Sequence, residues 1–135
     1  MAKKSSVVQT VPEFFGYWGK AGRHDTGCHR LVWHCLDVAA VADELLLRRD
    51  DWCRRWASLS GLDNNDARAL AVWMIGLHDI GKFAESFQYL RPDLRERFYP
   101  DLAVQCKSYD IKHDQLGHIL WSKKVRLELG RSLPT

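Results

Sequence analysis

Apolar residues recur with the period of a helix along most of the chain. In residues 30–48, RLVWHCLDVAAVADELLLR, the side chains of Leu31, Val38 and Leu45 share one helix face, and Trp33 falls on another. A helix with so little polar surface is usually buried. We therefore expect this helix to be central to the fold.

Turn and capping residues divide the rest of the chain into further helical segments. No segment alternates with a period of two, and dipeptides typical of tight hairpins are absent. The pattern predicts an all-α bundle of about five to six helices over residues 12–135, behind a flexible tail over 1–11. The expected segments are a short aromatic helix or turn at 12–22, a loop at 23–29, helices near 30–48, 51–60, 66–79 and 83–90, a short helix with a loop at 92–110, and a last helix at 113–129.

Length and composition are those of one ordinary soluble domain. The chain has 135 residues, 46% apolar and 27% charged. Its net charge of +3 permits an acidic or nucleic-acid partner without arguing for one. No apolar run reaches the roughly 18 residues of a membrane span, and MAKKSSVVQT lacks the apolar core of a signal peptide. We expect no membrane segment.

The cysteines predict a reducing environment. Cys28, Cys35, Cys53 and Cys106 form no C-x-x-C pair, and three of them lie in apolar, helix-like surroundings. Reduced thiols in a cytoplasmic protein are therefore expected instead of a disulfide framework.

The stretch WMIGLHDIGKF at 73–83 interrupts an apolar run with His78, Asp79 and Lys82. Burying a carboxylate without a partner is costly, so Asp79 needs Lys82, a metal ion or both. An imidazole and a carboxylate together suit iron, manganese, nickel or zinc, and such an ion could activate water for phosphoester hydrolysis. His34 would join from a second helix, although a lone histidine is more often a core or surface residue than a ligand.

Four stretches, in order, resemble one family. They are YWGK at 17–20, HRLVWHCLDVAAVA at 29–42, LHDIGKFAESFQ at 77–88 and IKHDQLGHILW at 111–121. Together they resemble the HD superfamily of metal-dependent phosphohydrolases. The closest resemblance is to the N-terminal HD nuclease domain of the type I CRISPR-associated nuclease-helicase. It implies an HD-like helical bundle.

The resemblance also implies a metal site, residue by residue. His34 matches the histidine of the family's first helix, and His78 with Asp79 matches its HD pair, in which the aspartate bridges two metals. His113 matches the histidine of the following motif. Lys82 matches the lysine beside the site and would be catalytic if the chain is active.

Two further motifs of that family are absent, so the domain is expected to be truncated. The family continues with a His-His dyad and a late helix carrying one more aspartate. His118 has no second histidine beside it, and Asp110 and Asp114 do not match the late aspartate. Three ligands of the first metal and two of the second would remain, and three can hold an ion with open positions. We expect no metal or a weakly bound divalent ion such as iron, manganese, nickel or cobalt.

Three functions compete. The chain could be a fragment or split subunit of a single-stranded DNA nuclease, or a small HD phosphohydrolase acting on nucleotides. We expect the third, a non-catalytic HD mimic acting in the bacterial host cell. It would interfere with type I CRISPR immunity by occupying the site where the nuclease-helicase docks on the surveillance complex, as an anti-CRISPR decoy would. Binding to the nuclease-helicase itself stays open. A start at Met and an end soon after the last expected helix favour a natural small protein.

A partner surface is expected on aromatic and basic side chains, because such residues are the usual hot spots of interfaces. The tryptophans could instead belong to the core and the arginines to a solvated face. The expected set is Trp18, Lys20, Trp52, Arg54, Arg55, Arg91 and Arg95.

Overall fold

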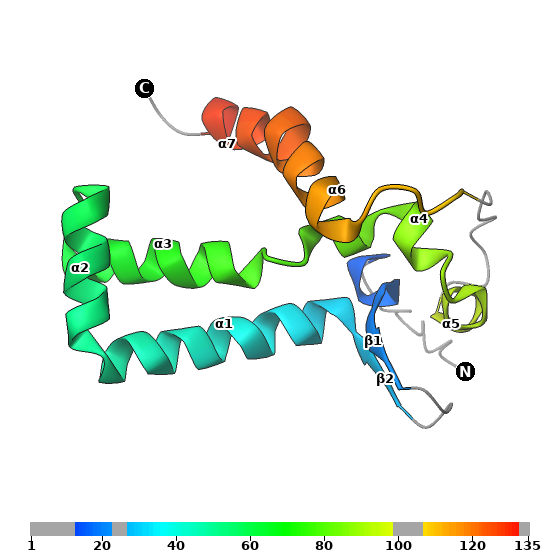
Figure 1. Cartoon of the computed structure of the whole chain (residues 1–135), viewed down its shortest axis with the longest axis horizontal. Helices are drawn as coiled ribbons and strands as arrows, with labels where there is room; N and C mark the ends of the chain where they lie inside the picture. The colour runs from blue at the N-terminus through cyan, green and yellow to red at the C-terminus, as the bar shows by residue number, and fades with distance from the viewer. Residues whose placement is uncertain (1–12, 23–26, 99–106, 133–135) are drawn as a thin grey trace, which may run out of the picture.

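The computed structural model describes residues 13–22, 27–98 and 107–132, and the expected tail over 1–11 and Cys106 lie outside them. The described chain is mainly helical, with one small antiparallel sheet (Figure 1). The expected all-α class is thereby confirmed. In chain order the elements are η1 (Glu13–Gly16), β1 (Trp18–Ala21), β2 (Cys28–Arg30), α1 (Leu31–Arg48), α2 (Asp50–Ser60), α3 (Asn64–Gly76), η2 (Ile80–Phe83), α4 (Glu85–Gln88), α5 (Pro92–Phe98), α6 (His113–Leu120), the π-helical stretch η3 (Trp121–Val125) and α7 (Arg126–Ser132).

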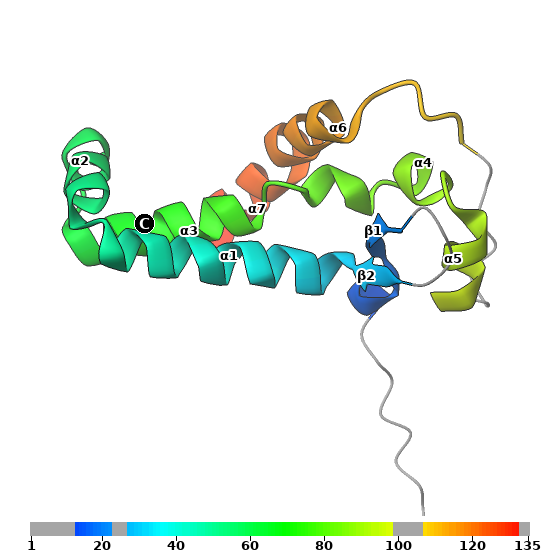
Figure 2. The same cartoon turned by 60° about the horizontal axis from the view of Figure 1, so that its bottom comes forward.

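Helices α1 and α3 lie side by side, and α2 connects them at one end of an elongated molecule (Figures 1 and 2). Local sequence signals explain where α2 ends and where α3 begins. Gly61 ends α2 in the left-handed conformation, with φ of 72°, which glycine adopts without steric cost. Asp63 caps α3, because its carboxylate accepts hydrogen bonds from the amides of Asn65 and Asp66.

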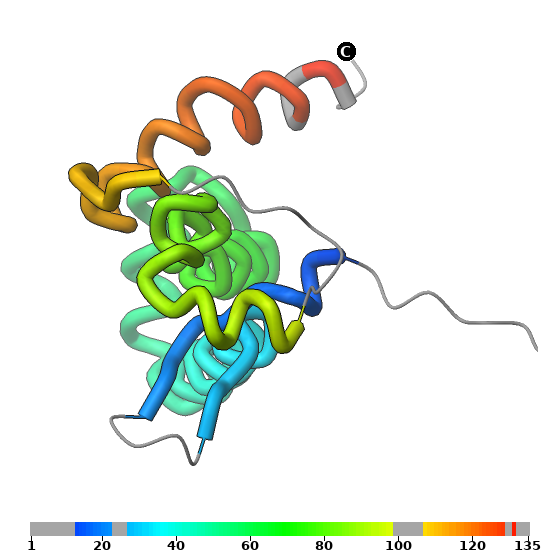
Figure 3. The backbone as a smooth tube through the Cα atoms, turned by 90° about the vertical axis from the view of Figure 1, so that its right-hand side faces the viewer, coloured from blue at the N-terminus to red at the C-terminus, as the bar shows by residue number. Residues whose placement is uncertain are grey.

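The last helix runs from α6 through η3 into α7 and diverges from α3 (Figure 3). It is longer than expected, since the helix passes beyond Leu129 to Ser132. The helix expected at 66–79 instead stops at Gly76, so the two residues of the HD pair lie in a turn.

The sheet is the main departure from expectation. Residues 18–21 were expected in a helix or turn, but they pair with Cys28–Arg30 as antiparallel strands. Gly19 allows the chain to pass close to α1, because a Cβ there would lie 2.8 Å from the Cα of Leu31. The pairing of β1 with β2 depends on this contact with α1, which the local sequence pattern does not indicate.

The buried core is small. Trp18, Phe87 and Leu94 form its centre, at the end of the molecule that holds the sheet. Many large apolar side chains of α1, α2 and α3 are exposed, which is unusual for a protein that acts alone. Among the described residues, no helix is long and apolar enough to cross a membrane. The exposed apolar residues of these three helices include Trp33, Leu36, Val41, Leu45, Leu47, Trp52, Leu59, Trp73, Met74 and Ile75.

Gln88 is a fully buried polar residue that ties the sheet to the region of the HD pair. Its Oε1 accepts from the amide of Trp18 at 3.1 Å, and its Nε2 donates to the carbonyls of Trp18 at 2.9 Å and Lys82 at 2.7 Å. These bonds hold β1 beside Lys82.

Gln88→Ala is therefore expected to destabilise the fold. It leaves backbone groups of Trp18 and Lys82 buried without partners, and each such group costs about 1–3 kcal/mol. We expect a loss of about 2–4 kcal/mol in urea unfolding. The control is Gln115→Ala on the exposed side of α6, which should change stability by less than about 0.5 kcal/mol. Equal stability of the two variants would contradict the role assigned to Gln88.

Candidate metal centre

The HD pair lies in the turn between α3 and η2. Leu77 closes the end of α3, and the His78 amide donates to the Ile75 carbonyl at 3.1 Å. The turn directs Asp79 inward, where it is only 5% exposed, and leaves His78 at the surface. A continuous helix would have separated the two side chains by about 100°.

Four basic side chains surround the Asp79 carboxylate. Its Oδ2 lies 3.0 Å from His34 Nε2 and 3.1 Å from His78 Nε2. The Lys82 ammonium lies 2.7 Å from the same oxygen. The other oxygen, Oδ1, faces His113 Nε2 at 3.6 Å. The structure thus brings together every side chain proposed for the site, from α1, the HD turn, η2 and α6.

Hydrogen bonds to groups outside the donor cluster orient the imidazole rings of His78 and His113. His78 Nδ1 lies 2.8 Å from the Ile75 carbonyl, which can only accept, so Nδ1 carries a proton and Nε2 faces Asp79. The Tyr109 hydroxyl accepts from the His113 amide at 2.7 Å and lies 3.2 Å from His113 Nδ1. Tyr109 was not among the residues expected at the site. It lies before the start of α6, so no helical spacing in the sequence connects it to His113.

The charge balance keeps Asp79 ionised. Burial alone would raise the pKa of Asp79, but the hydrogen bond and charge of Lys82, with the charges of His78 and His34, hold it below its ordinary value. Burial and the nearby Asp79 charge raise the pKa of the Cys35 thiol, partly offset by Lys82. The site therefore offers a carboxylate at neutral pH, beside a protonated thiol.

The donor set fits a metal ion. One donor atom each from His34, His78 and Asp79 lies within 4.8 Å of the others. Two imidazoles and a carboxylate form a common ligand set for catalytic transition metals and leave coordination positions open. His113 with Asp79 offers two donors for a second position. Lys82 competes for the same carboxylate oxygen, which is consistent with the expectation of weak binding.

Two of the residues expected on a partner surface are buried, so that part of the expectation is wrong. Trp18 stacks on Phe87, and its Nε1 donates to the Gln88 carbonyl at 3.0 Å. Arg95 is 1% exposed, because it pairs with Glu85 at 3.0 Å and packs over the Tyr17 ring.

The other members of the expected surface do not form one patch. Lys20 lies on β1, at the opposite end of the molecule from Trp52, Arg54 and Arg55 on α2 (Figure 1). Arg91 is half-buried and pairs with the neighbouring Asp93. A partner role for the exposed members stays a prediction.

The convergence of two histidines and a buried aspartate in a helical fold is typical of a protein with a transition-metal site. The sequence pattern of the family described as Cas3, HD domain, matches residues 18–133, and the chain belongs to this family. It is similar to the CRISPR-associated endonuclease/helicase Cas3 of Escherichia coli (strain K12), with 40% identity over 80 residues. That match covers 54% of this chain and 9% of that protein, so the chain spans a small part of its relative. No solved structure matches it.

Proposed function

We propose that this chain carries the metal-binding part of an HD nuclease centre that cleaves single-stranded DNA in a type I CRISPR system of a bacterial cell. The observation that carries the proposal is the convergence of His34, His78 and Lys82 on one oxygen of Asp79. The family membership supports it, because the relative in Escherichia coli is an endonuclease/helicase.

Each side chain has a chemical role in this proposal. His34, His78 and Asp79 would hold a divalent transition metal, which supplies Lewis-acid activation of water and of a phosphoryl oxygen. Lys82 would donate to a phosphate oxygen and offset its negative charge. His113, whose Nε2 lies 3.6 Å from Asp79 Oδ1, would add a metal ligand or donate a proton to the leaving oxygen of the substrate.

The exposed apolar faces of α1, α2 and α3 support completion of the centre by further polypeptide. Helix α3 exposes Trp73, Met74 and Ile75 on successive positions, although an apolar helix is normally covered. Covering these faces would exclude water near the cluster and could bring the missing ligands. We therefore expect the chain alone to bind metal weakly, to lose it on dialysis, and to cleave slowly.

The test is cleavage of a fluorophore-labelled single-stranded oligonucleotide with added manganese, nickel or cobalt. The expected result is slow, metal-dependent cleavage by the parent and none by a His78→Ala/Asp79→Ala double variant that is folded by circular dichroism. Absence of cleavage while the parent holds a metal, measured by mass spectrometry of the metal content, would overturn the nuclease proposal.

A second candidate is the non-catalytic decoy, and the same exposed apolar surface favours it. Such a surface can dock on the surveillance complex or on the nuclease-helicase itself, while Lys82 offsets Asp79 without any metal. The test is phage plating on a bacterium with an intact type I system. Equal inhibition by the parent and the double variant would favour the decoy. Loss of the effect by a folded double variant, with DNA cleavage by the parent, would favour the nuclease.

A further inference from the structure

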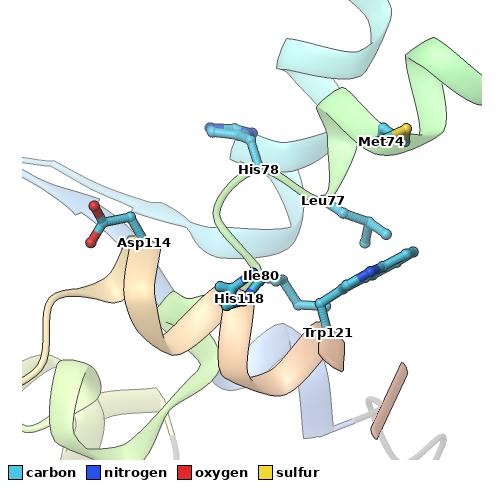
Figure 4. A pocket seen from close by; sticks show the side chains of 8 residues that line it. Met74, Leu77, His78, Ile80, Asp114, His118 and Trp121 are labelled. Atoms are coloured by element: carbon cyan, nitrogen blue, oxygen red, sulfur yellow. The ribbon is translucent and has the colours of Figure 1, made fainter. Parts of the chain in front are cut away.

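A cavity of about 230 Å³ opens beside the metal centre, between the end of α3, the HD turn and α6. Its apolar wall is formed by Met74, Leu77 and Ile80 (Figure 4). Its size suits a single flat ring better than a whole nucleotide chain. An apolar wall with a few polar groups is the usual composition of a small-molecule site.

Another part of the lining comes from α6 and the first residue of η3. Asp114 and His118 on α6 and Trp121 at the start of η3 are spaced by four and three residues, and all three line the cavity (Figure 4). Gly117 brings α6 close to η2, because a Cβ there would lie 3.3 Å from the amide nitrogen of Gly81. The Trp121 ring is supported by an edge contact with Trp73, with ring centroids 5.5 Å apart.

His78 connects the cavity to the metal centre. It lines the cavity, and its Nε2 is 3.1 Å from Asp79 Oδ2. A ligand whose phosphate lies at the cluster would therefore place an adjoining group in the cavity. Asp114 on the rim disfavours a second phosphate there, because two anions repel.

The chemistry of the cavity matches a nucleobase. The faces of a base are apolar and stack on aromatic rings, which Trp121 can supply. The edges of a base carry hydrogen-bond donors and acceptors. Asp114 can accept a hydrogen bond from such an edge, and His118 can donate or accept one. We propose that this cavity binds the nucleobase next to the cleaved phosphodiester. The inference rests on the proposed nuclease function, which it deepens by naming the part of the substrate that is recognised.

The first test compares two esters with the same leaving group, thymidine 5′-p-nitrophenyl phosphate and methyl p-nitrophenyl phosphate, with manganese. The parent should show a higher kcat/KM for the thymidine ester. Trp121→Ala should lower that preference about tenfold and leave the rate with the methyl ester unchanged. Trp121→Phe, which keeps a flat ring, should retain most of the preference. Trp52→Ala, an exposed tryptophan on α2, is the matched control and should behave as the parent.

The second test needs neither metal nor activity. Binding of the dinucleotide thymidylyl-thymidine is followed by saturation-transfer NMR, with 2-deoxyribose 5-phosphate as the probe that lacks a base. The expected result is saturation of the base protons and about tenfold weaker binding to Trp121→Ala, while Trp121→Phe still binds.

The outcomes separate the two proposals. Cleavage of both esters without a thymidine preference would overturn the base site and leave the nuclease function standing. Dinucleotide binding that depends on Trp121, without cleavage of either ester, would support the base site and overturn the nuclease function. Equal binding of both probes, or dinucleotide binding that is unchanged in Trp121→Ala, would overturn the base site.

Discussion

Asp79→Asn is expected to abolish metal binding while the chain stays folded. Asp79 is the only carboxylate in the donor cluster, and its two oxygens face both positions where an ion could be held. An amide is a poor ligand for transition metals compared with a carboxylate. We expect the affinity for manganese or nickel, measured by calorimetry, to fall sharply. The loss should exceed the 10–100-fold that is typical when a residue that only orients a metal ligand is replaced.

A matched control is Asp37→Asn. Asp37 lies one turn after His34 on α1 and, in the described structure, pairs only with the half-exposed His29. That variant should bind metal as the parent does. Metal binding that survives in Asp79→Asn would place the ion elsewhere and remove the basis of the proposed site. Asp79→Ala is the harsher change, because asparagine keeps an oxygen that can accept a hydrogen bond from Lys82 and alanine does not. Removing one partner of a buried ion pair altogether costs about 3–5 kcal/mol.

The helices could be predicted from the sequence because their signals are local. The apolar period over residues 30–48 and the caps around Gly61 and Asp63 gave α1, α2 and the start of α3 within a few residues. The sheet could not be predicted, because β1 and β2 are short and their pairing depends on packing against Leu31.

The ligand residues could be proposed from the sequence because they lie in motifs of the resembled family. His34 Nε2 lies 3.0 Å from Asp79 Oδ2, in agreement with the expectation that His34 joins the HD pair from a second helix. Gln88 ends one of these motifs, but its structural role could not be predicted from the sequence, because its partner Trp18 is 70 residues away. Trp18 and Arg95 were misplaced because residue type alone does not distinguish a buried anchor from an exposed one.

The exposed apolar residues connect the fold to both candidate functions. The carboxylate of Asp79 is buried among its basic partners, yet the apolar side chains of Trp73 and Met74, a few residues before it, are exposed. The chain therefore combines an ordered polar centre with an uncovered apolar surface. A covering polypeptide is expected in either case, as the completing part of a nuclease or as the target of a decoy.

Gly81→Ala is the second change expected to have a large effect, because it acts where η2 meets α6. A Cβ at Gly81 would lie 1.8 Å from the His113 carbonyl oxygen and 2.4 Å from the Gly117 amide nitrogen. Both are backbone atoms, so α6 must move away and carry His113 with it. Overpacking usually costs about 1–3 kcal/mol, and we expect the upper end or more. That corresponds to a fall of roughly 10 °C in Tm for a domain of this size.

Two other glycines provide a graded control for this variant. A Cβ at Gly117 would lie 3.3 Å from Gly81 N, and one at Gly27 would meet nothing within 4 Å. Thermal unfolding should therefore show a large loss for Gly81→Ala, a smaller one for Gly117→Ala and almost none for Gly27→Ala. Gly81→Ala should also weaken metal binding if His113 contributes, because His113 Nε2 is 3.6 Å from Asp79 Oδ1 only while α6 packs on η2. If Gly81→Ala unfolds at the parent's temperature, α6 does not pack on η2 as described, and His113 loses its place in the centre.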